Sequence, residues 1–238
     1  MGLFDKKYCD FCGEKIGLLG NRKLEDGNMC KKCAKKISPW LTGRKGYTVE
    51  EMKEHLAYRE DNEKKVADFN PTRVLGLETK VYLDEDKGEF LVSRFKNFRD
   101  NNPDILEFSQ ITGCDTVIEE SQHEIYREGP DGENISYDPP RYRKTYDFKV
   151  ILNVNSPWFT QMKIMVESDD VEQYSPEYRQ AERVCEEIKE VLGSIRSDRR
   201  AAVEEAARPK TAVRCPYCGA TTTPDAQGKC EYCGGAIG

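Results

Sequence analysis

Eight of the ten cysteines stand in four C-x-x-C pairs, two pairs near each end of the chain. These cysteines are Cys9, Cys12, Cys30 and Cys33, and then Cys215, Cys218, Cys230 and Cys233. A two-residue gap lets both thiolates of a pair reach one metal ion at about 2.3 Å, and two pairs complete a tetrahedron. A closed site of this kind stabilises a fold and does not activate water. The sequence therefore predicts two structural Zn²⁺ ions and no other cofactor.

The cysteine pattern also indicates a reducing compartment. Only Cys114 and Cys185 lie in the long middle region, so a disulfide scaffold is not expected there. A thioredoxin-like redox site would be a single C-x-x-C pair in a βαβ setting. No stretch approaches the roughly 18 consecutive apolar residues of a membrane span, and the first nine residues lack a signal core. We expect a cytoplasmic protein.

Charge is distributed unevenly along a chain whose formal net charge is −6. Residues 1–46 carry eleven Lys or Arg against five Asp or Glu, whereas residues 47–214 carry 25 against 36. A basic head could indicate nucleic-acid binding. Four thiolates on Zn²⁺ form a centre of charge −2, however, so part of the head's basic charge offsets its own metal site.

The first part of the chain predicts a zinc domain and a helix. Residues 1–46 form the N-terminal four-cysteine domain, in which Leu18-Leu19 is expected to be a short strand. Residues 47–70 form a connecting helix that opens with a capping box of Thr48 and Glu51. Its apolar positions are sparse, which predicts a solvated helix packed on one side.

Residues 71–196 alternate like a half-buried antiparallel sheet and end in an amphipathic helix. Ser175 caps that helix, Pro176 opens it, and its apolar residues recur at three- and four-residue steps. Several antiparallel strands followed by one covering helix predict an α+β fold with a pleckstrin-homology-like centre. A generic α+β sheet with a covering helix would give the same pattern.

The end of the chain predicts a linker and a second zinc domain. Residues 197–214 have few large apolar side chains and predict a linker or a frayed helical extension. Residues 215–238 predict a minimal zinc ribbon, with Gly219 and Gly234 following its two pairs. We expect that losing either zinc site unfolds only its own module, because the middle core is independent of metal.

The cysteine-rich head resembles a known family. Residues 1–24, followed by Cys30-Lys-Lys-Cys33, resemble an uncharacterised bacterial family, mainly from Firmicutes, that is defined by an N-terminal four-cysteine domain of unknown function. Residues 105–112 and 215–226 also resemble full-length members. The resemblance implies zinc binding at both ends of a pleckstrin-homology-like middle domain, and it implies no assigned role.

The residue pattern argues against catalysis. The two histidines, His55 and His123, are predicted at the surface, and neither has a nucleophile and an acid nearby. Cys114 in a strand and Cys185 on an apolar helix face are predicted to be buried, inert thiols. No catalytic residue is therefore assigned, and a protein that is not an enzyme is expected.

Three classes of partner remain to be weighed. An adaptor that binds another protein through its middle domain is the reading that we favour. The alternative is a nucleic-acid-binding zinc ribbon, because aromatic residues stand near the cysteine pairs; the competing explanation is that they shield the thiolates. Lipid binding is not expected, because in the acidic middle only Arg141, Arg143 and Lys144 form a basic patch.

Overall fold

The computed structural model describes residues 6–207, 212–225 and 227–237. The chain divides into two compact units, Met1–Arg196 and Ser197–Gly238, and the division falls inside the last helix. Parts of the predicted zinc domains (1–5, 226 and 238) and of the predicted linker (208–211) lie outside the described residues. The first unit is a mixed α/β structure with antiparallel sheets.

The first unit begins with two short hairpins and a one-turn helix. These elements are β1 (Lys7–Tyr8), β2 (Lys15–Ile16), β3 (Arg22–Lys23), β4 (Asn28–Met29), α1 (Lys31–Ala34) and a 3-10 turn, η1 (Arg44–Gly46). β1 pairs with β2, and β3 pairs with β4. The predicted strand at Leu18-Leu19 is wrong: a glycine on each side closes these residues into a turn between β2 and β3.

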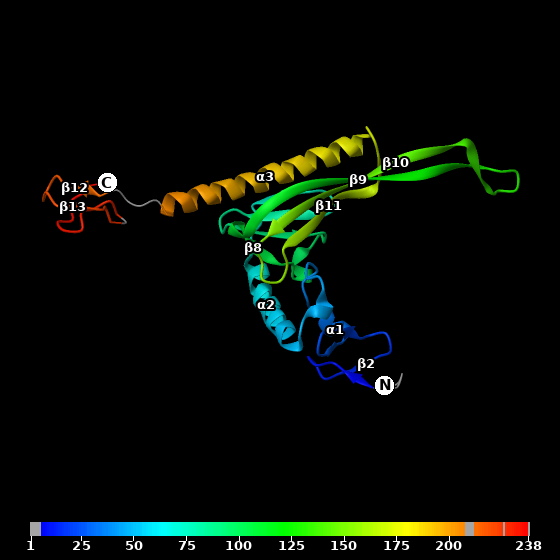
Figure 1. Cartoon of the computed structure of the whole chain (residues 1–238), viewed down its shortest axis with the longest axis horizontal. Helices are drawn as coiled ribbons and strands as arrows, with labels where there is room; N and C mark the ends of the chain where they lie inside the picture. The colour runs from blue at the N-terminus through cyan, green and yellow to red at the C-terminus, as the bar shows by residue number, and fades with distance from the viewer. Residues whose placement is uncertain (1–5, 208–211, 226, 238) are drawn as a thin grey trace. The chain divides into compact units, whose positions relative to one another are not determined.

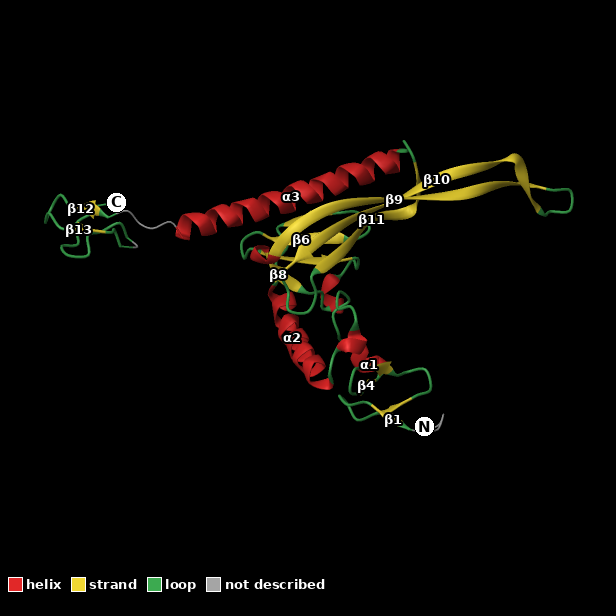
Figure 2. Ribbon diagram, viewed as in Figure 1, coloured by secondary structure: helices red, strands yellow, loops and turns green. Residues whose placement is uncertain are grey.

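Helix α2 (Val49–Asp68) starts at the predicted capping box. The Thr48 Oγ1 atom accepts the Glu51 N–H at 3.2 Å, and the Glu51 carboxylate accepts the Thr48 N–H at 2.8 Å. Two of the backbone donors at the helix start are satisfied in this way. In Figure 2 α2 lies below the sheets, and α1 is close to its first turns.

The buried face of α2 is mainly polar. Met52 and Val66 are buried, as an apolar stripe requires, but His55, Arg59 and Asn62 lie between them and are at most 4% exposed. The prediction of a surface position for His55 is therefore wrong. Hydrophobic periodicity cannot detect such a face, because burial of these side chains depends on partners that are distant in sequence.

The partners of this polar face come from a buried aspartate and its neighbours. Asp104 accepts hydrogen bonds from Arg59 Nη1 and from Ser38 Oγ, both at 2.7 Å. The Asn62 side chain donates to the Pro103 carbonyl at 2.7 Å and accepts the Ile105 N–H at 3.0 Å. The network fastens the head, α2 and the start of β8 to one another.

Two antiparallel sheets follow. The first has the order β5-β6-β7-β8 and the second has the order β11-β10-β9. Their strands are β5 (Arg73–Leu75), β6 (Lys80–Asp84), β7 (Glu89–Ser93), β8 (Ile105–Glu107), β9 (Ile111–Glu128), β10 (Asn134–Val154) and β11 (Gln161–Glu172), with 3-10 turns η2 (Phe98–Asn101) and η3 (Phe108–Gln110). The Thr79 N–H donates to the Met165 carbonyl at 2.9 Å and joins the two sheets.

Helix α3 (Pro176–Ala207) covers the core between the sheets. Its buried residues are Ala181, Cys185, Ile188 and Leu192, on one face as predicted. The Tyr178 N–H donates to the predicted cap, Ser175 Oγ, at 3.0 Å. The helix continues through residues 197–207, so this part of the predicted linker is the helical extension, as its alanine, glutamate and arginine content favours.

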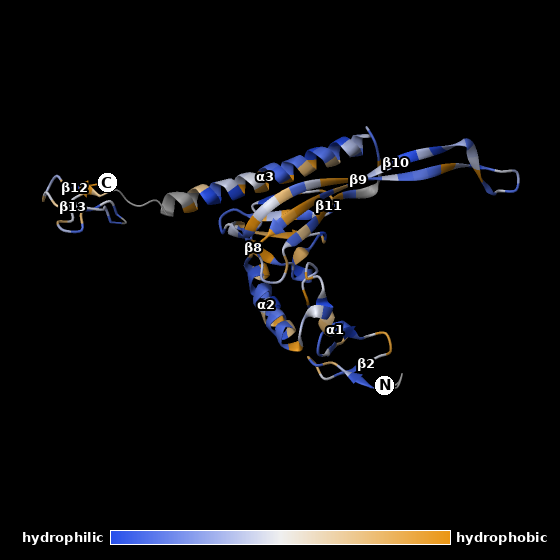
Figure 3. Cartoon of the chain, viewed as in Figure 1, coloured by the Kyte–Doolittle hydropathy of each residue, from blue (hydrophilic) through white to orange (hydrophobic). Residues whose placement is uncertain are grey.

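Strands β9 and β10 run past the end of β11. The pairing of β10 with β11 stops at Thr145 and Glu172, whereas the pairing of β10 with β9 continues to Asn134 and Glu128. Residues 122–144 therefore form a two-stranded hairpin without a third strand, which we call the arm (Figure 1). Figure 3 shows that most of the arm is hydrophilic.

The second unit is built on a short hairpin, in which β12 (Val213–Arg214) pairs with β13 (Thr221–Thr222). An isolated bridge between Lys229 and Ala236 lies near the second cysteine pair. Among the described residues of the whole chain, no helix has the length and apolar character needed to cross a membrane.

Candidate metal centres

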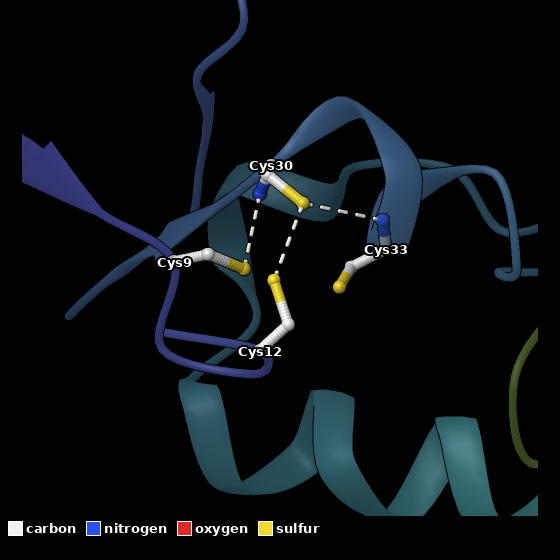
Figure 4. A group of neighbouring side chains, drawn as sticks. All are labelled: Cys9, Cys12, Cys30 and Cys33. Carbon is white, nitrogen blue, oxygen red and sulfur yellow. Dashed lines mark hydrogen bonds between the residues drawn. The ribbon is translucent and has the colours of Figure 1, made fainter. Parts of the chain in front are cut away.

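The first four cysteines converge from two places in the head. Cys9 and Cys12 lie after β1, whereas Cys30 caps the N-terminus of α1 and Cys33 lies within it. Figure 4 shows the four sulfur atoms pointing toward one another, and all lie within 4.8 Å of one another. Cys12 Sγ and Cys30 Sγ are 3.7 Å apart, close to the sulfur–sulfur edge of about 3.8 Å in a tetrahedron with metal–sulfur bonds of about 2.3 Å.

Backbone N–H groups hold these sulfurs in place. The Cys30 N–H donates to Cys9 Sγ at 3.2 Å, and the Cys33 N–H donates to Cys30 Sγ at 3.4 Å. Bonds of this kind orient a thiolate and stabilise its negative charge. The sulfur group is thus organised by the backbone around it, and Cys12 is the one exposed member.

The head site lies on a small apolar core that α2 completes. Cys9, Cys30 and Cys33 pack in one cluster with Leu24, Met29, Leu41 and Met52. Met52 comes from α2 and is fully buried. Trp158 contacts both this cluster and the main core, so the head is packed onto the rest of the first unit.

The last four cysteines form a second group in the second unit. All four sulfurs again lie within 4.8 Å of one another. Cys215 Sγ is 3.5 Å from Cys233 Sγ, and Cys218 Sγ is 3.7 Å from Cys230 Sγ. Cys215 and Cys230 are buried, whereas Cys218 and Cys233 are exposed.

Three of the four pairs share one backbone conformation. In each of them a glycine at positive φ follows the second cysteine. Its N–H donates to the carbonyl of the first cysteine at 2.8 to 2.9 Å, a bond that Ala34 also makes to Cys30, at 3.0 Å. These glycines are Gly13, Gly219 and Gly234, with φ between 70° and 76°. Ala34 stands at the matching place after Cys33, and there the chain forms α1. A positive φ suits glycine and is costly for alanine. We call the compact turn of the three glycine-following pairs a knuckle; the pair followed by Ala34 continues into a helix instead.

Comparison with known proteins gives a match over the first part of the chain. Residues 7–55 match the family described as "Domain of unknown function (DUF4428)". No curated protein matches the chain. No solved structure matches it. The DUF4428 segment contains the first four cysteines and reaches His55 in α2, so it includes Met52, the residue that α2 contributes to the head core.

Thiol acidity in the DUF4428 segment differs from one cysteine to the next. Burial raises the pKa of Cys9, but backbone N–H groups, chiefly that of Cys30, outweigh it and lower this pKa to about 7. Burial and the neighbouring cysteines raise the pKa of Cys33. One thiolate therefore forms readily and opposes ionisation of the others, a repulsion that a bound cation removes.

The last four cysteines, which we call the tail group, also differ from one another in thiol pKa. Burial again acts against backbone N–H groups, chiefly that of Cys218, and the pKa of Cys215 falls to about 6. At Cys233 a hydrogen bond from the Gly235 backbone lowers the pKa, but the Cys215 and Cys218 side chains outweigh it and raise the value to about 12. Both four-cysteine groups are thus positioned to hold a metal ion.

The two histidines stand in different surroundings. His55 is fully buried, its Nε2 accepts the Ser38 N–H at 3.0 Å, and its ring meets Trp158 edge-on. Burial, followed by the charge of Arg59, lowers the pKa of His55 to about 4, so its imidazole is neutral at physiological pH. His123 lies on β9 in the exposed arm.

Burial affects the acidity of the two remaining cysteines. Burial is the main cause that raises the pKa of Cys114 to about 12 and that of Cys185 to about 11. The prediction that Cys185 is buried is confirmed, since this residue is 1% exposed, while Cys114 is half-buried. Thiols with raised pKa values hold little thiolate at pH 7.

Sequence reasoning missed the exposure of several apolar and aromatic side chains near the cysteines. Tyr217 and Tyr232 are each 71% exposed, and Tyr8 is 54% exposed. These three rings lie mostly in solvent, which does not favour the explanation that they shield the thiolates, whereas Phe11 packs on the head core. Leu18 and Leu19 are exposed even further.

Proposed function

We propose that this protein is a bacterial, cytoplasmic zinc-binding adaptor, in which two structural Zn²⁺ sites flank a middle domain that binds another protein. The four-thiolate sets with sulfur–sulfur distances of 3.5 to 3.7 Å support zinc, because this ion favours closed tetrahedral sulfur sites. All ten cysteines are free, which agrees with a reducing compartment. The resemblance of the head supports a bacterial source.

For the middle domain we propose a pleckstrin-homology-like arrangement. Its support is the element order: a four-stranded antiparallel sheet, a three-stranded one and a final helix that covers the core between them. The hydrogen bonds from Glu78 and Thr79 to β11 close the gap between the two sheets on one side. Such a frame carries binding surfaces on its strand edges and loops.

The arm is the surface at which we propose that a protein partner binds. β9 is the edge strand of its sheet over all of its length, and an edge strand offers backbone groups to an added strand. Within the arm Ile125, Tyr126 and Tyr142 are 41 to 57% exposed. An isolated two-stranded hairpin is marginally stable in water, so a bound segment would stabilise this one.

The charges of the arm favour protein over lipid. Lys144 pairs with Glu120 at 2.8 Å, and Arg143 pairs with Glu172 at 3.5 Å. The basic patch noted in the sequence is therefore largely neutralised within the chain. An anionic lipid surface would have to compete with these carboxylates.

Capture from native lysate tests the adaptor. We expect the wild-type chain to retain a reproducible protein partner that the double variant Tyr126→Ser/Tyr142→Ser loses. Val74→Ser is the matched control, because Val74 is also a strand residue and is 48% exposed. Equal capture by the arm variant and by the control would contradict the proposal.

Nucleic-acid binding through the tail is the second candidate. Exposed Tyr217 and Tyr232 offer faces on which bases could stack. Filter binding to single-stranded nucleic acid at low salt tests it, with Tyr217→Ser/Tyr232→Ser as the variant. Affinity that falls with salt and with this variant would favour nucleic acid over a protein partner.

We infer that the protein is not an enzyme. The support is the neutral, hydrogen-bonded His55 and the raised thiol pKa values of Cys114 and Cys185. The two four-cysteine groups use all their ligand positions for sulfur, which is the arrangement of structural sites. Metal replacement tests the inference, since Cd²⁺ in place of Zn²⁺ should preserve partner capture.

A further inference from the structure

Two leucines form the tip of a tight turn in the head. The turn comprises residues 17–20, and the Gly20 N–H donates to the Gly17 carbonyl at 2.9 Å. Leu18 and Leu19 occupy its two central positions and are 92% and 90% exposed. In Figure 3 a loop beside the β2 label carries the hydrophobic colour.

The leucines are presented on an anchored frame. Ile16, immediately before the turn, is buried in the head core, and Leu24 after it is 1% exposed. Arg22 Nη1 donates to the Leu19 carbonyl at 3.4 Å, and Asn21 is tied to Asn28 by a side-chain hydrogen bond of 2.8 Å. The turn thus holds two adjacent large apolar side chains in water, which is costly unless something covers them.

Basic residues lie on the strands that flank the turn. Lys7 lies opposite Ile16 across the hairpin, Lys15 precedes Ile16, and Lys23 lies on β3. All three lysines are exposed, and none has an ion pair among the residues that the structure describes. We call these lysines the collar.

Two of the acidic groups near the collar in sequence have partners, while Glu25, two residues after Lys23, is exposed. Asp10 accepts the Asn28 N–H at 2.6 Å, and Glu14 pairs with Lys32 at 3.0 Å. The tip therefore combines an apolar end with a positive base. This combination matches the edge of a bilayer, where hydrocarbon lies just behind anionic headgroups.

We propose that the turn at residues 17–20 inserts Leu18 and Leu19 into a membrane surface that contains anionic lipid, with the collar at the headgroups. This surface is distinct from the acidic middle region, whose composition argues against lipid. The inference is also independent of the partner proposed for the arm. It adds an anchoring role to the head, which would place the arm and its partner at a membrane.

Co-sedimentation with vesicles tests the proposal, using the full zinc-loaded chain. We expect binding to phosphatidylcholine vesicles that contain phosphatidylglycerol and weak or no binding to phosphatidylcholine alone. Leu18→Ser/Leu19→Ser should lose at least about tenfold in partitioning, because it removes the apolar tip. Lys15→Glu/Lys23→Glu should lose at least about tenfold and abolish the preference for anionic vesicles.

Two measurements guard against a folding defect. Each variant should keep the zinc content of the wild-type chain, since none of the substituted side chains belongs to the head core. Val203→Ser is the matched control: Val203 is 68% exposed on α3, and its substitution should leave vesicle binding unchanged. Absence of vesicle binding by the wild-type chain, or equal binding by the leucine variant, would overturn the proposal.

A spectroscopic variant reports insertion itself. With Leu19→Trp we expect emission to move to shorter wavelength when anionic vesicles are added, and not when neutral ones are added. The native Trp40 and Trp158 lie partly buried against the cores and supply a background that the wild-type chain measures. Binding without such a shift would show adsorption by charge alone and would overturn insertion.

Discussion

The residue that follows each C-x-x-C pair differs in the same way as the backbone conformation of that pair. Three pairs are followed by a glycine at positive φ, and the fourth is followed by Ala34 and becomes helix α1. The metal ligands are equivalent in chemistry, so this difference is one of conformation. The head therefore contains one knuckle and one helix, whereas the tail contains two knuckles of the same conformation.

Substitution of a knuckle glycine tests this rule. Gly13→Ala should destabilise the zinc-bound head by about 1–2 kcal/mol, because alanine at φ 70° is strained although there is space for its methyl group. Zinc competition with a chromophoric chelator, in a Cys218→Ser background, would show a matching loss of affinity. Gly17→Ala is the control, since its backbone is ordinary and the space is open; equal effects of the two would contradict the rule.

His55 should make stability depend on pH. Its folded pKa of about 4 is below the ordinary unfolded value of about 6.5, so the unfolded chain binds the proton first as pH falls. The contribution of neutral His55 is fully present above pH 6.5 and is lost toward pH 4, by about 2 kcal/mol between pH 7 and 5. Urea unfolding of the wild-type chain and of His55→Gln at both pH values measures it.

The comparison between variants isolates this histidine. Thiolate protonation in the metal sites also lowers stability in acid, but it affects the wild-type chain and His55→Gln equally. An unchanged slope in His55→Gln would show that His55 does not carry the effect.

At the scale of elements, buried polar contacts accompany the apolar residues that α2 buries. The side chains of Arg59 and Asp104 are 5% and 0% exposed and form an ion pair of 2.7 Å. Tyr58 OH also donates to Asp104, at 3.3 Å. A buried pair of this kind gives little net stability compared with apolar residues, but it specifies how α2 sits against residues 102–105.

Removal of the aspartate should therefore be severe. Asp104→Ala leaves Arg59 buried without its carboxylate and should cost about 3–5 kcal/mol in unfolding free energy. Asp61→Ala is the control, because Asp61 pairs with Lys64 on the same helix with both side chains exposed, and it should cost less than about 0.5 kcal/mol. Chemical denaturation of both variants checks the contrast; similar losses would contradict the role of burial.

The sequence predicted those elements whose signal is local. The capping box at Thr48, the covering helix after Ser175 and the convergence of both cysteine groups are confirmed. The polar face of α2 could not be predicted, because burial of Arg59 and Asn62 depends on residues 102–105, about 40 positions later. The arm could not be predicted either, because it exists only where the shorter β11 ends.

At the scale of the whole molecule, the two metal groups differ in how far their loss should spread. The head shares Met52 and Trp158 with the rest of the first unit, whereas the tail belongs to the second unit. Cys218→Ser should remove hydrogen-exchange protection within residues 212–237 only. Cys12→Ser should also lower hydrogen-exchange protection in α2, at Met52. This differs from the expectation that losing a zinc site unfolds only its own module. Protection of α2 equal to that of the wild-type chain would support the original expectation.

The central claim is that this chain holds two Zn²⁺ ions in its eight paired cysteines. Metal analysis of the protein purified under reducing conditions tests it most directly, together with Cys12→Ser and Cys218→Ser. We predict two zinc ions per wild-type chain and one in each variant, with the ion of the untouched site retained. A different metal in the wild-type chain, or a zinc content that neither substitution changes, would contradict it.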